Sequence, residues 1–123
     1  MANGSNDFGV SFAQISFLDR LLTVHSNVVE VTRSNDIQFD IVRQRGGPVR
    51  LVCLNEYTCG LARVFEAQTA FPGVNLIYVG GAWNSYTGDA KRYCRDSQIG
   101  LFNAKEIAGA LHRDDWWRYV RAD

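Results

Sequence analysis

The residues best suited to chemistry gather in the stretch "RLVCLNEYT", an apolar strand pattern that ends in Asn55 and Glu56. An earlier strand pattern, "IQFDIVRQ", carries Asp40 in its middle, where an acid is disfavoured and so points to a partner or a function. Carboxylate oxygens are the ligands that Mg²⁺ prefers, and a bound Mg²⁺ can support cleavage of a phosphodiester. Asp40 and Glu56 are therefore candidate acids of a metal-dependent site.

The turn "RGGP" between these two patterns predicts a β-hairpin. If the hairpin turns at its two glycines, Asp40 lies opposite Cys53, and Asn55 follows Cys53 on the same face because side chains alternate. Glu56 then points to the other face, unless a bulge at the strand end turns it back. Glu30, on the adjacent predicted strand, is a third acid that could point inward.

The predicted cross-strand pairing of the hairpin allows two interpretations of this site. Thiolate is a soft ligand and suits Mg²⁺ poorly, and Asn55 can hydrogen-bond a phosphate but carries no charge. In the first interpretation these positions bind no metal ion, and Asp40 is as much a structural as a functional residue. In the second, Asp40 and Glu56, with Glu30, form a Mg²⁺ site.

Hydrophobic periodicity places these residues in an α/β domain. Apolar residues at helical spacing alternate with short β-rich runs, in the order helix, three strands, helix, strand, helix, strand, helix. The three consecutive strands predict an antiparallel meander, which leads into a right-handed βαβ crossover with parallel strands. The result is a mixed central sheet with helices on both faces. The predicted helices cover residues 8–25, 61–71, 85–98 and 103–112, and the strands 27–33, 37–44, 49–56, 74–81 and 99–102. Thr87 and Asn103 are the predicted N-caps of the last two helices.

Three stretches carry a resemblance to a known superfamily. They are the hairpin "FDIVRQRGGPVRLVCLNEYT", the helix that holds Gln68, and "NLIYVGGAWNSYTGDAKRYCRDSQIGLFNAKEIAGAL", with its strand, Gly turn, helix, short strand and final helix. Together they resemble the restriction-endonuclease-like (PD-(D/E)XK) superfamily, and most closely its Mrr-type nucleases, over about residues 10 to 112. The resemblance implies a three-layer restriction-endonuclease-like fold with an antiparallel meander followed by a βαβ unit.

The resemblance also implies site roles. Asp40 fits the family's first acid, Cys53 stands at its second acid, and Asn55 stands at its lysine, so the acid-x-Lys motif is degenerate. Gln68 resembles the Gln of Mrr-type enzymes, although a glutamine on a helix face is more often structural. We expect a nuclease-like domain with impaired catalysis that acts in nucleic-acid binding or assembly. The alternatives are an active Mg²⁺-dependent DNA endonuclease that uses Asp40 and Glu56, and a protein–protein interaction module of a defence or immunity type.

Composition limits the partners and the compartment. The 123 residues carry a formal net charge of zero, which gives no support to nucleic-acid binding through bulk charge. No apolar run is long enough to span a bilayer, and the polar start "MANGSND" does not have the pattern of a secretory signal, so we expect no membrane partner and a cytoplasmic protein with reduced cysteines. Residues 1–7 read as a disordered lead-in, and residues 8–123 as one domain.

Two further features allow other chemistry. Cys59 precedes a helix, where a thiol can become reactive, although a small residue at a helix entry is the simpler interpretation. The three cysteines and two histidines do not have the spacing of a zinc site. The tail "RDDWWRYVRAD" contains Trp116, Trp117 and Tyr119, which could cap the core, bind another protein or a second copy, or stack on bases.

Overall fold

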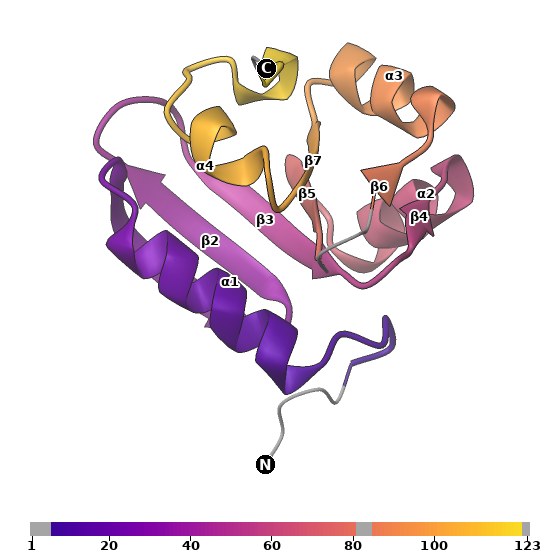
Figure 1. The fold of residues 1–123 in the computed structure, drawn as a ribbon, viewed down its shortest axis with the longest axis horizontal. Helices are drawn as coiled ribbons and strands as arrows, with labels where there is room; N and C mark the ends of the chain where they lie inside the picture. The colour runs from indigo at the N-terminus through magenta and orange to yellow at the C-terminus, as the bar shows by residue number, and fades with distance from the viewer. Residues whose placement is uncertain (1–5, 81–84, 122–123) are drawn as a thin grey trace.

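The computed structural model describes residues 6–80 and 85–121, and its centre is a mixed five-stranded sheet (Figure 1). The strand order is β1-β2-β3-β5-β7; β1, β2 and β3 are antiparallel, and β3, β5 and β7 are parallel. This sheet confirms the predicted α/β class with a mixed sheet. The strands are β1 (Val28–Ser34), β2 (Gln38–Arg43), β3 (Val49–Leu54), β5 (Leu76–Val79) and β7 (Gly100–Asn103). A short parallel ribbon of β4 (Thr58–Cys59) and β6 (Ser85–Tyr86) lies apart from this sheet and was not predicted.

The helices divide between the two ends of the sheet. In Figure 1, α1 lies across β1 and β2, whereas α2 and α3 gather beside β5 and β7. Ser11 caps α1 in a capping box with Gln14, and Thr87 caps α3 as predicted by accepting a hydrogen bond from the Ala90 amide. The helices are α1 (Phe12–Val24), α2 (Leu61–Ala70), α3 (Gly88–Asp96), α4 (Ile107–Ala110) and the 3₁₀ turn η1 (Trp116–Arg118).

Burial along β2 shows that the two faces of the sheet are covered unequally. Phe39, Ile41 and Arg43 alternate as buried residues and face α1 and the C-terminal segment. On the other face Asp40 is half-exposed and Val42 is 49% exposed. On this second face, α2 covers the part of the sheet that lies beyond β3, whereas β1 and β2 are open. We call the open area around Asp40 and Val42 the outer β1–β3 face.

The register of the β2–β3 hairpin differs from the predicted one. Ile41 pairs with Val49 and Asp40 with Arg50, so Asp40 does not lie opposite Cys53. The cause is a wide loop folded around the buried side chain of Arg43, whose Nε and Nη2 donate to the Gly47 carbonyl. Because the Arg43 side chain fills the loop, the position of the two glycines does not give the centre of the turn. The resulting register shift changes the cross-strand partner of every paired residue of β3.

Other boundaries also differ from the prediction. The expected helix over 103–112 is the single turn α4, and Asn103 is the last residue of β7 and not an N-cap. Residues 1–5 of the expected lead-in lie outside the described residues. Asn6, by contrast, is fixed to the domain because its side chain binds the Val10 backbone and the Asp36 carboxylate.

Candidate functional site

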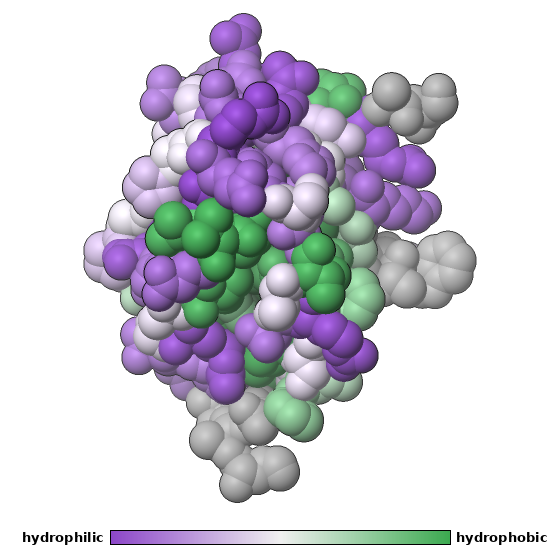
Figure 2. All heavy atoms as spheres, turned by 90° about the vertical axis from the view of Figure 1, so that its left-hand side faces the viewer, coloured by the Kyte–Doolittle hydropathy of each residue, from purple (hydrophilic) through white to green (hydrophobic). Residues whose placement is uncertain are grey.

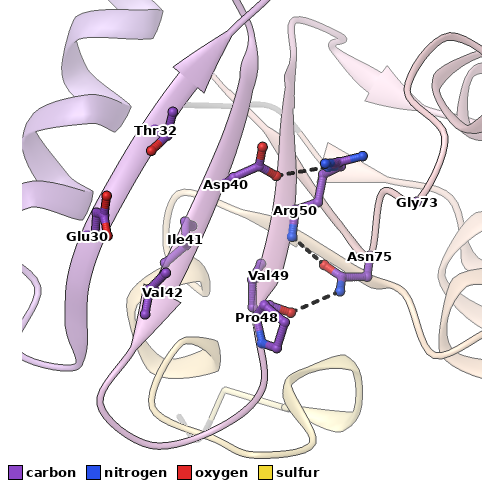
Figure 3. Close-up of a pocket in the computed structure, with 10 residues that line it drawn as sticks. All are labelled: Glu30, Thr32, Asp40, Ile41, Val42, Pro48, Val49, Arg50, Gly73 and Asn75. Atoms are coloured by element: carbon purple, nitrogen blue, oxygen red, sulfur yellow. Dashed lines mark hydrogen bonds and ion pairs between the residues drawn. The ribbon is translucent and has the colours of Figure 1, made fainter.

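Asp40 lies in the middle of β2 and forms an ion pair with its partner across the hairpin. Arg50 Nε lies 2.8 Å from Asp40 Oδ1, and Gln38 Nε2 donates to Asp40 Oδ2 at 3.1 Å (Figure 3). Arg50 is itself fixed, because its Nη1 donates to the Pro72 carbonyl at 2.8 Å. Both oxygens of Asp40 therefore have donors from the protein.

Cys53, predicted beside Asp40, lies on the opposite face of β3. Its backbone amide donates to the Ile37 carbonyl, and its side chain is fully buried in the core. Burial raises the pKa of the Cys53 thiol to about 12, so the sulfur stays protonated at neutral pH. Cys53 is a core residue and lies away from the outer β1–β3 face.

Glu56 follows the end of β3 and belongs to a different ion pair. Arg63, on the first turn of α2, places its Nε 3.0 Å from Glu56 Oε2, and its Nη1 3.2 Å from Glu66 Oε1. Glu56 comes six positions after Arg50, the cross-strand partner of Asp40. β3 continues four residues beyond Arg50 to Leu54, so at about 3.3 Å per residue the strand alone separates the two acids by about 13 Å, and each acid is paired with its own arginine.

Asn55 and Gln68, the other two predicted site residues, each have a structural partner. Gln14 Nε2 on α1 donates to Asn55 Oδ1 at 3.0 Å, and Asn55 Nδ2 donates to the Gly9 carbonyl at 3.0 Å. Tyr93 on α3 donates its hydroxyl hydrogen to Gln68 Oε1 at 2.9 Å. Asn55 thus fastens the N-terminal segment to the end of β3, and Gln68 joins α2 to α3.

Glu30 is the predicted acid that the structure brings near Asp40. Thr32 pairs with Asp40 and Glu30 pairs with Val42, so both acids belong to the outer β1–β3 face. They line one shallow hollow of about 400 Å³ (Figure 3). The remaining lining residues are Thr32, Ile41, Val42, Pro48, Val49, Arg50, Gly73 and Asn75. Two acids against a single basic side chain, which is already paired, give the hollow a net negative charge.

The sequence allowed an arginine partner for Glu56 but did not identify which arginines neutralise the candidate acids. Arg50 and Arg63 were visible in the sequence, but their roles depend on the hairpin register and on the approach of α2 to the end of β3. Asp36 was also missed; it precedes β2, close to the end of β3, and accepts hydrogen bonds from Asn6 and from Arg33. Had the loop been recognised as one that encloses the Arg43 side chain, the hairpin register would have placed Arg50 opposite Asp40.

The C-terminal tail contributes to the core. Trp116 is 7% exposed, its Nε1 donates to the Asn75 carbonyl at 2.8 Å, and the Arg43 guanidinium lies over its ring. Tyr119 packs edge-on against Phe102, and Trp117 edge-on against Trp116. For Trp116 the core-capping interpretation is confirmed.

Cys59, the candidate reactive thiol, is buried. Burial and the nearby Glu56 raise its pKa to about 11, and Arg63 acts in the opposite direction with a smaller effect. The simpler interpretation, a small residue at a helix entry, is the one that fits this environment.

Within residues 6–80 and 85–121, no three His, Cys, Asp or Glu side chains come together as a metal site would require. No helix in the same residues has the length and apolar character needed to cross a bilayer. No family model, no curated protein and no solved structure matches the chain. The class that can be stated is therefore that of a small α/β domain with a mixed five-stranded sheet.

Proposed function

We propose that the protein is a restriction-endonuclease-like domain that acts in assembly, by binding another protein on its outer β1–β3 face. The observation that carries the proposal is the pairing of each candidate catalytic acid with its own arginine: Asp40 with Arg50, and Glu56 with Arg63. To bind Mg²⁺, each carboxylate would first have to exchange its guanidinium partner. This pairing favours a role for the open face in recognition over one in metal-dependent cleavage.

The exposed surface supports a macromolecular partner. Figure 2 looks at the side formed by α1, β1 and β2, where apolar side chains gather among polar ones. Of the exposed apolar residues of these elements, Val42 lies on the outer β1–β3 face, whereas Phe12, Phe17 and Val24 belong to α1, on the other side of the sheet. Exposed apolar surface with a polar border is typical of protein interaction sites.

The charge of the hollow favours a protein over a nucleic acid. Glu30 and Asp40 outnumber Arg50, so phosphates would meet a repulsive field. A partner that presents a basic side chain flanked by apolar residues is complementary to this surface. A second copy docked about a twofold axis through this face would bring the same acids together, which disfavours a symmetric dimer here.

The test measures partner binding with matched variants. Glu30→Lys and Val42→Arg should each abolish stoichiometric co-purification of a basic partner, whereas Arg92→Glu on the exposed surface of α3 should leave it intact. Each variant must keep the unfolding midpoint of the wild type within a few degrees. Retention of the same partner by both face variants would overturn the proposal.

The competing nuclease interpretation rests on Glu30 and Asp40 lining one hollow, since two carboxylates can serve as Mg²⁺ ligands. It predicts nicking of plasmid DNA in Mg²⁺ or Mn²⁺ that disappears in Asp40→Asn. Metal-dependent nicking of this kind would replace the assembly proposal with the enzyme. DNA affinity that falls steeply with salt and is lost on removal of exposed arginines would favour nucleic-acid binding instead.

A further inference from the structure

β1 is the edge strand of the sheet beside the outer β1–β3 face. It comes first in the strand order, and β2 is its one strand partner among the described residues 6–80 and 85–121. Four of its seven residues are exposed, and Val29 is 60% exposed. A strand with one neighbour directs the backbone N–H and C=O groups of alternate residues away from the sheet. The β1 edge is therefore a row of backbone donors and acceptors that a further strand can use.

The hydrogen-bond pattern of the neighbouring hairpin shows which residues of β1 face this edge. The Cys53 amide donates to the Ile37 carbonyl, and such bonds recur at every second residue of an antiparallel pair. The odd-numbered residues of β2 therefore bond to β3, and the even-numbered ones bond to β1. Thr32 pairs with an even-numbered residue of β2, so its backbone groups are used inside the sheet. The backbone groups of Val31 and Arg33 point to the open edge, where no described group bonds to them.

The side chains beside the edge on the outer β1–β3 face include two acids. Figure 3 draws Glu30 and Thr32 on β1 next to Asp40 on β2. Arg50 is the partner of Asp40, whereas Glu30 takes part in no ion pair within the described residues. An added strand places one side chain directly opposite Glu30, where an opposite charge stabilises the pairing and a like charge destabilises it. A basic residue is therefore complementary at that position of the incoming strand.

We infer that the partner of the outer β1–β3 face binds through an extended segment, which adds a strand to β1 and sets a basic residue opposite Glu30. This inference rests on the proposed function and specifies how that partner binds. The backbone groups of Val31 and Arg33 supply hydrogen bonds that any extended chain can form, and Glu30 supplies the selection for charge. A bulge lies between Val28 and Glu30, which leaves residues 30–34 as the regular part of the edge.

A second copy of the chain is a poorer fit to this edge. Two copies that share a continuous sheet about a twofold axis turn the same face of their sheets to the same side. Glu30 would then lie opposite an outer-face residue of the other β1, and those residues, Glu30, Thr32 and Ser34, include no basic side chain. Arg33 pairs with a buried residue of β2 and so lies on the inner face, and it forms an ion pair with Asp36. A foreign segment with a lysine or arginine meets the requirement that a second copy does not.

The test uses randomised short peptides with a fixed central lysine, selected on the immobilised full chain, and a matched library with a fixed central glutamate. Only the lysine library should yield binders. Methylation of one alternate set of backbone nitrogens in a selected peptide should weaken its binding at least about tenfold, and methylation of the other set much less. Amide hydrogen exchange reports the binding mode. The Val31 and Arg33 amides should exchange rapidly in the free protein and become protected in the complex, whereas the Thr32 amide should be protected in both.

Two variants at one position separate the backbone from the side chain. Arg33→Pro removes an outward amide N–H without the loss of a bond to β2, and it should weaken peptide binding at least about tenfold. Arg33→Ala removes the same side chain but keeps the amide, and its affinity should stay within about twofold of the wild type. Equal affinities of the two variants would overturn the inference. The exchange measurement needs no variant and decides the matter even if Arg33→Pro folds poorly.

The outcomes distinguish this inference from the proposed function. Binders that are lost in Val42→Arg but leave the Val31 and Arg33 amides unprotected would overturn the added strand and leave the protein-binding face in place. A lysine library that yields no binder would also overturn the added strand. Retention of the co-purified partner by both Glu30→Lys and Val42→Arg would instead overturn the proposed function itself.

Discussion

Arg50 Nε and Asp40 Oδ1 lie 2.8 Å apart at directly opposed positions of β3 and β2. Both side chains are about two-fifths exposed, so solvent screens their attraction and the pair contributes about 0–1 kcal/mol. Arg50 also donates to the Pro72 carbonyl. Asp40 also accepts from Gln38 Nε2, a hydrogen bond that the side-chain oxygen of an asparagine can still accept, so replacing Arg50 removes more than replacing Asp40 by Asn.

We expect Asp40→Asn to change the free energy of unfolding by less than about 1 kcal/mol. Arg50→Met should cost more, by about 1 kcal/mol, because it also removes the donor to Pro72. Urea unfolding of both single variants and of the double variant gives the coupling energy. A coupling well above about 1 kcal/mol would show that the pair is less screened than its exposure indicates.

Arg43 should be the costliest charged residue to replace. Its guanidinium is buried and donates to the carbonyls of Gly47, Leu111 and Arg113, with Trp116 against its face. Arg43→Met removes the side-chain donor to the Gly47 and Arg113 carbonyls and one of two donors to the Leu111 carbonyl, and should destabilise the protein by about 3 kcal/mol or more. The exposed Arg45, two residues later, is the control, and Arg45→Met should change stability by less than about 0.5 kcal/mol. Similar unfolding midpoints for the two variants would refute this role.

The ring of His112 should make stability sensitive to mild acid. It stacks on His25 with ring centres 4.3 Å apart, and burial, His25 and Arg45 lower its pKa. The unfolded chain takes up a proton near pH 6.5 and the folded protein only at lower pH. Stability should therefore be level above about pH 6.5 and fall below it.

His112→Gln tests this pH dependence by guanidinium unfolding between pH 5 and 7. The variant should have a flatter pH profile than the wild type over this range. The pKa of Asp115 is lowered by its hydrogen bond from Arg113, so its effect belongs to stronger acid and does not interfere. Identical slopes for both proteins would assign the pH dependence to other groups.

The three thiols should be inert in the folded protein. Cys53, Cys59 and Cys94 are buried, and burial raises the pKa of each, to about 12, 11 and 12. Reaction with a disulfide reagent at pH 8 should be slow under native conditions and fast and complete in guanidinium. A single thiol that reacts rapidly in the native protein would revive the interpretation of Cys59 as a reactive residue.

The sequence predicted much of the fold, because the fold rests on local patterns. Apolar periodicity placed α1 and α2, and the Thr87 cap of α3 follows from side-chain chemistry within one turn. The β4–β6 ribbon was missed because strands of two residues have no measurable alternation. The register was missed because it depends on Arg43, whose carbonyl partners at Leu111 and Arg113 are distant in sequence.

The error in the predicted hairpin register affected the prediction of the candidate site more than that of the fold. Residue types alone identified Asp40 and Glu56, but their partners depend on a shift along β3 and on the approach of α2. Asp40 gains a guanidinium where a thiol was expected, and Glu56 gains Arg63. One hairpin loop thus decides whether the two acids belong to one site or to two ion pairs.

The buried Arg43 also has a consequence for folding order. Its side chain holds the β2–β3 loop through Gly47 and the C-terminal segment through Leu111 and Arg113. Until that segment docks, the guanidinium lacks most of its acceptors, and the hairpin is free to slip to other pairings of the same apolar strands. A nascent or truncated chain without residues beyond 110 should therefore populate misregistered hairpins, and the final pairing should form together with the last contacts of the chain.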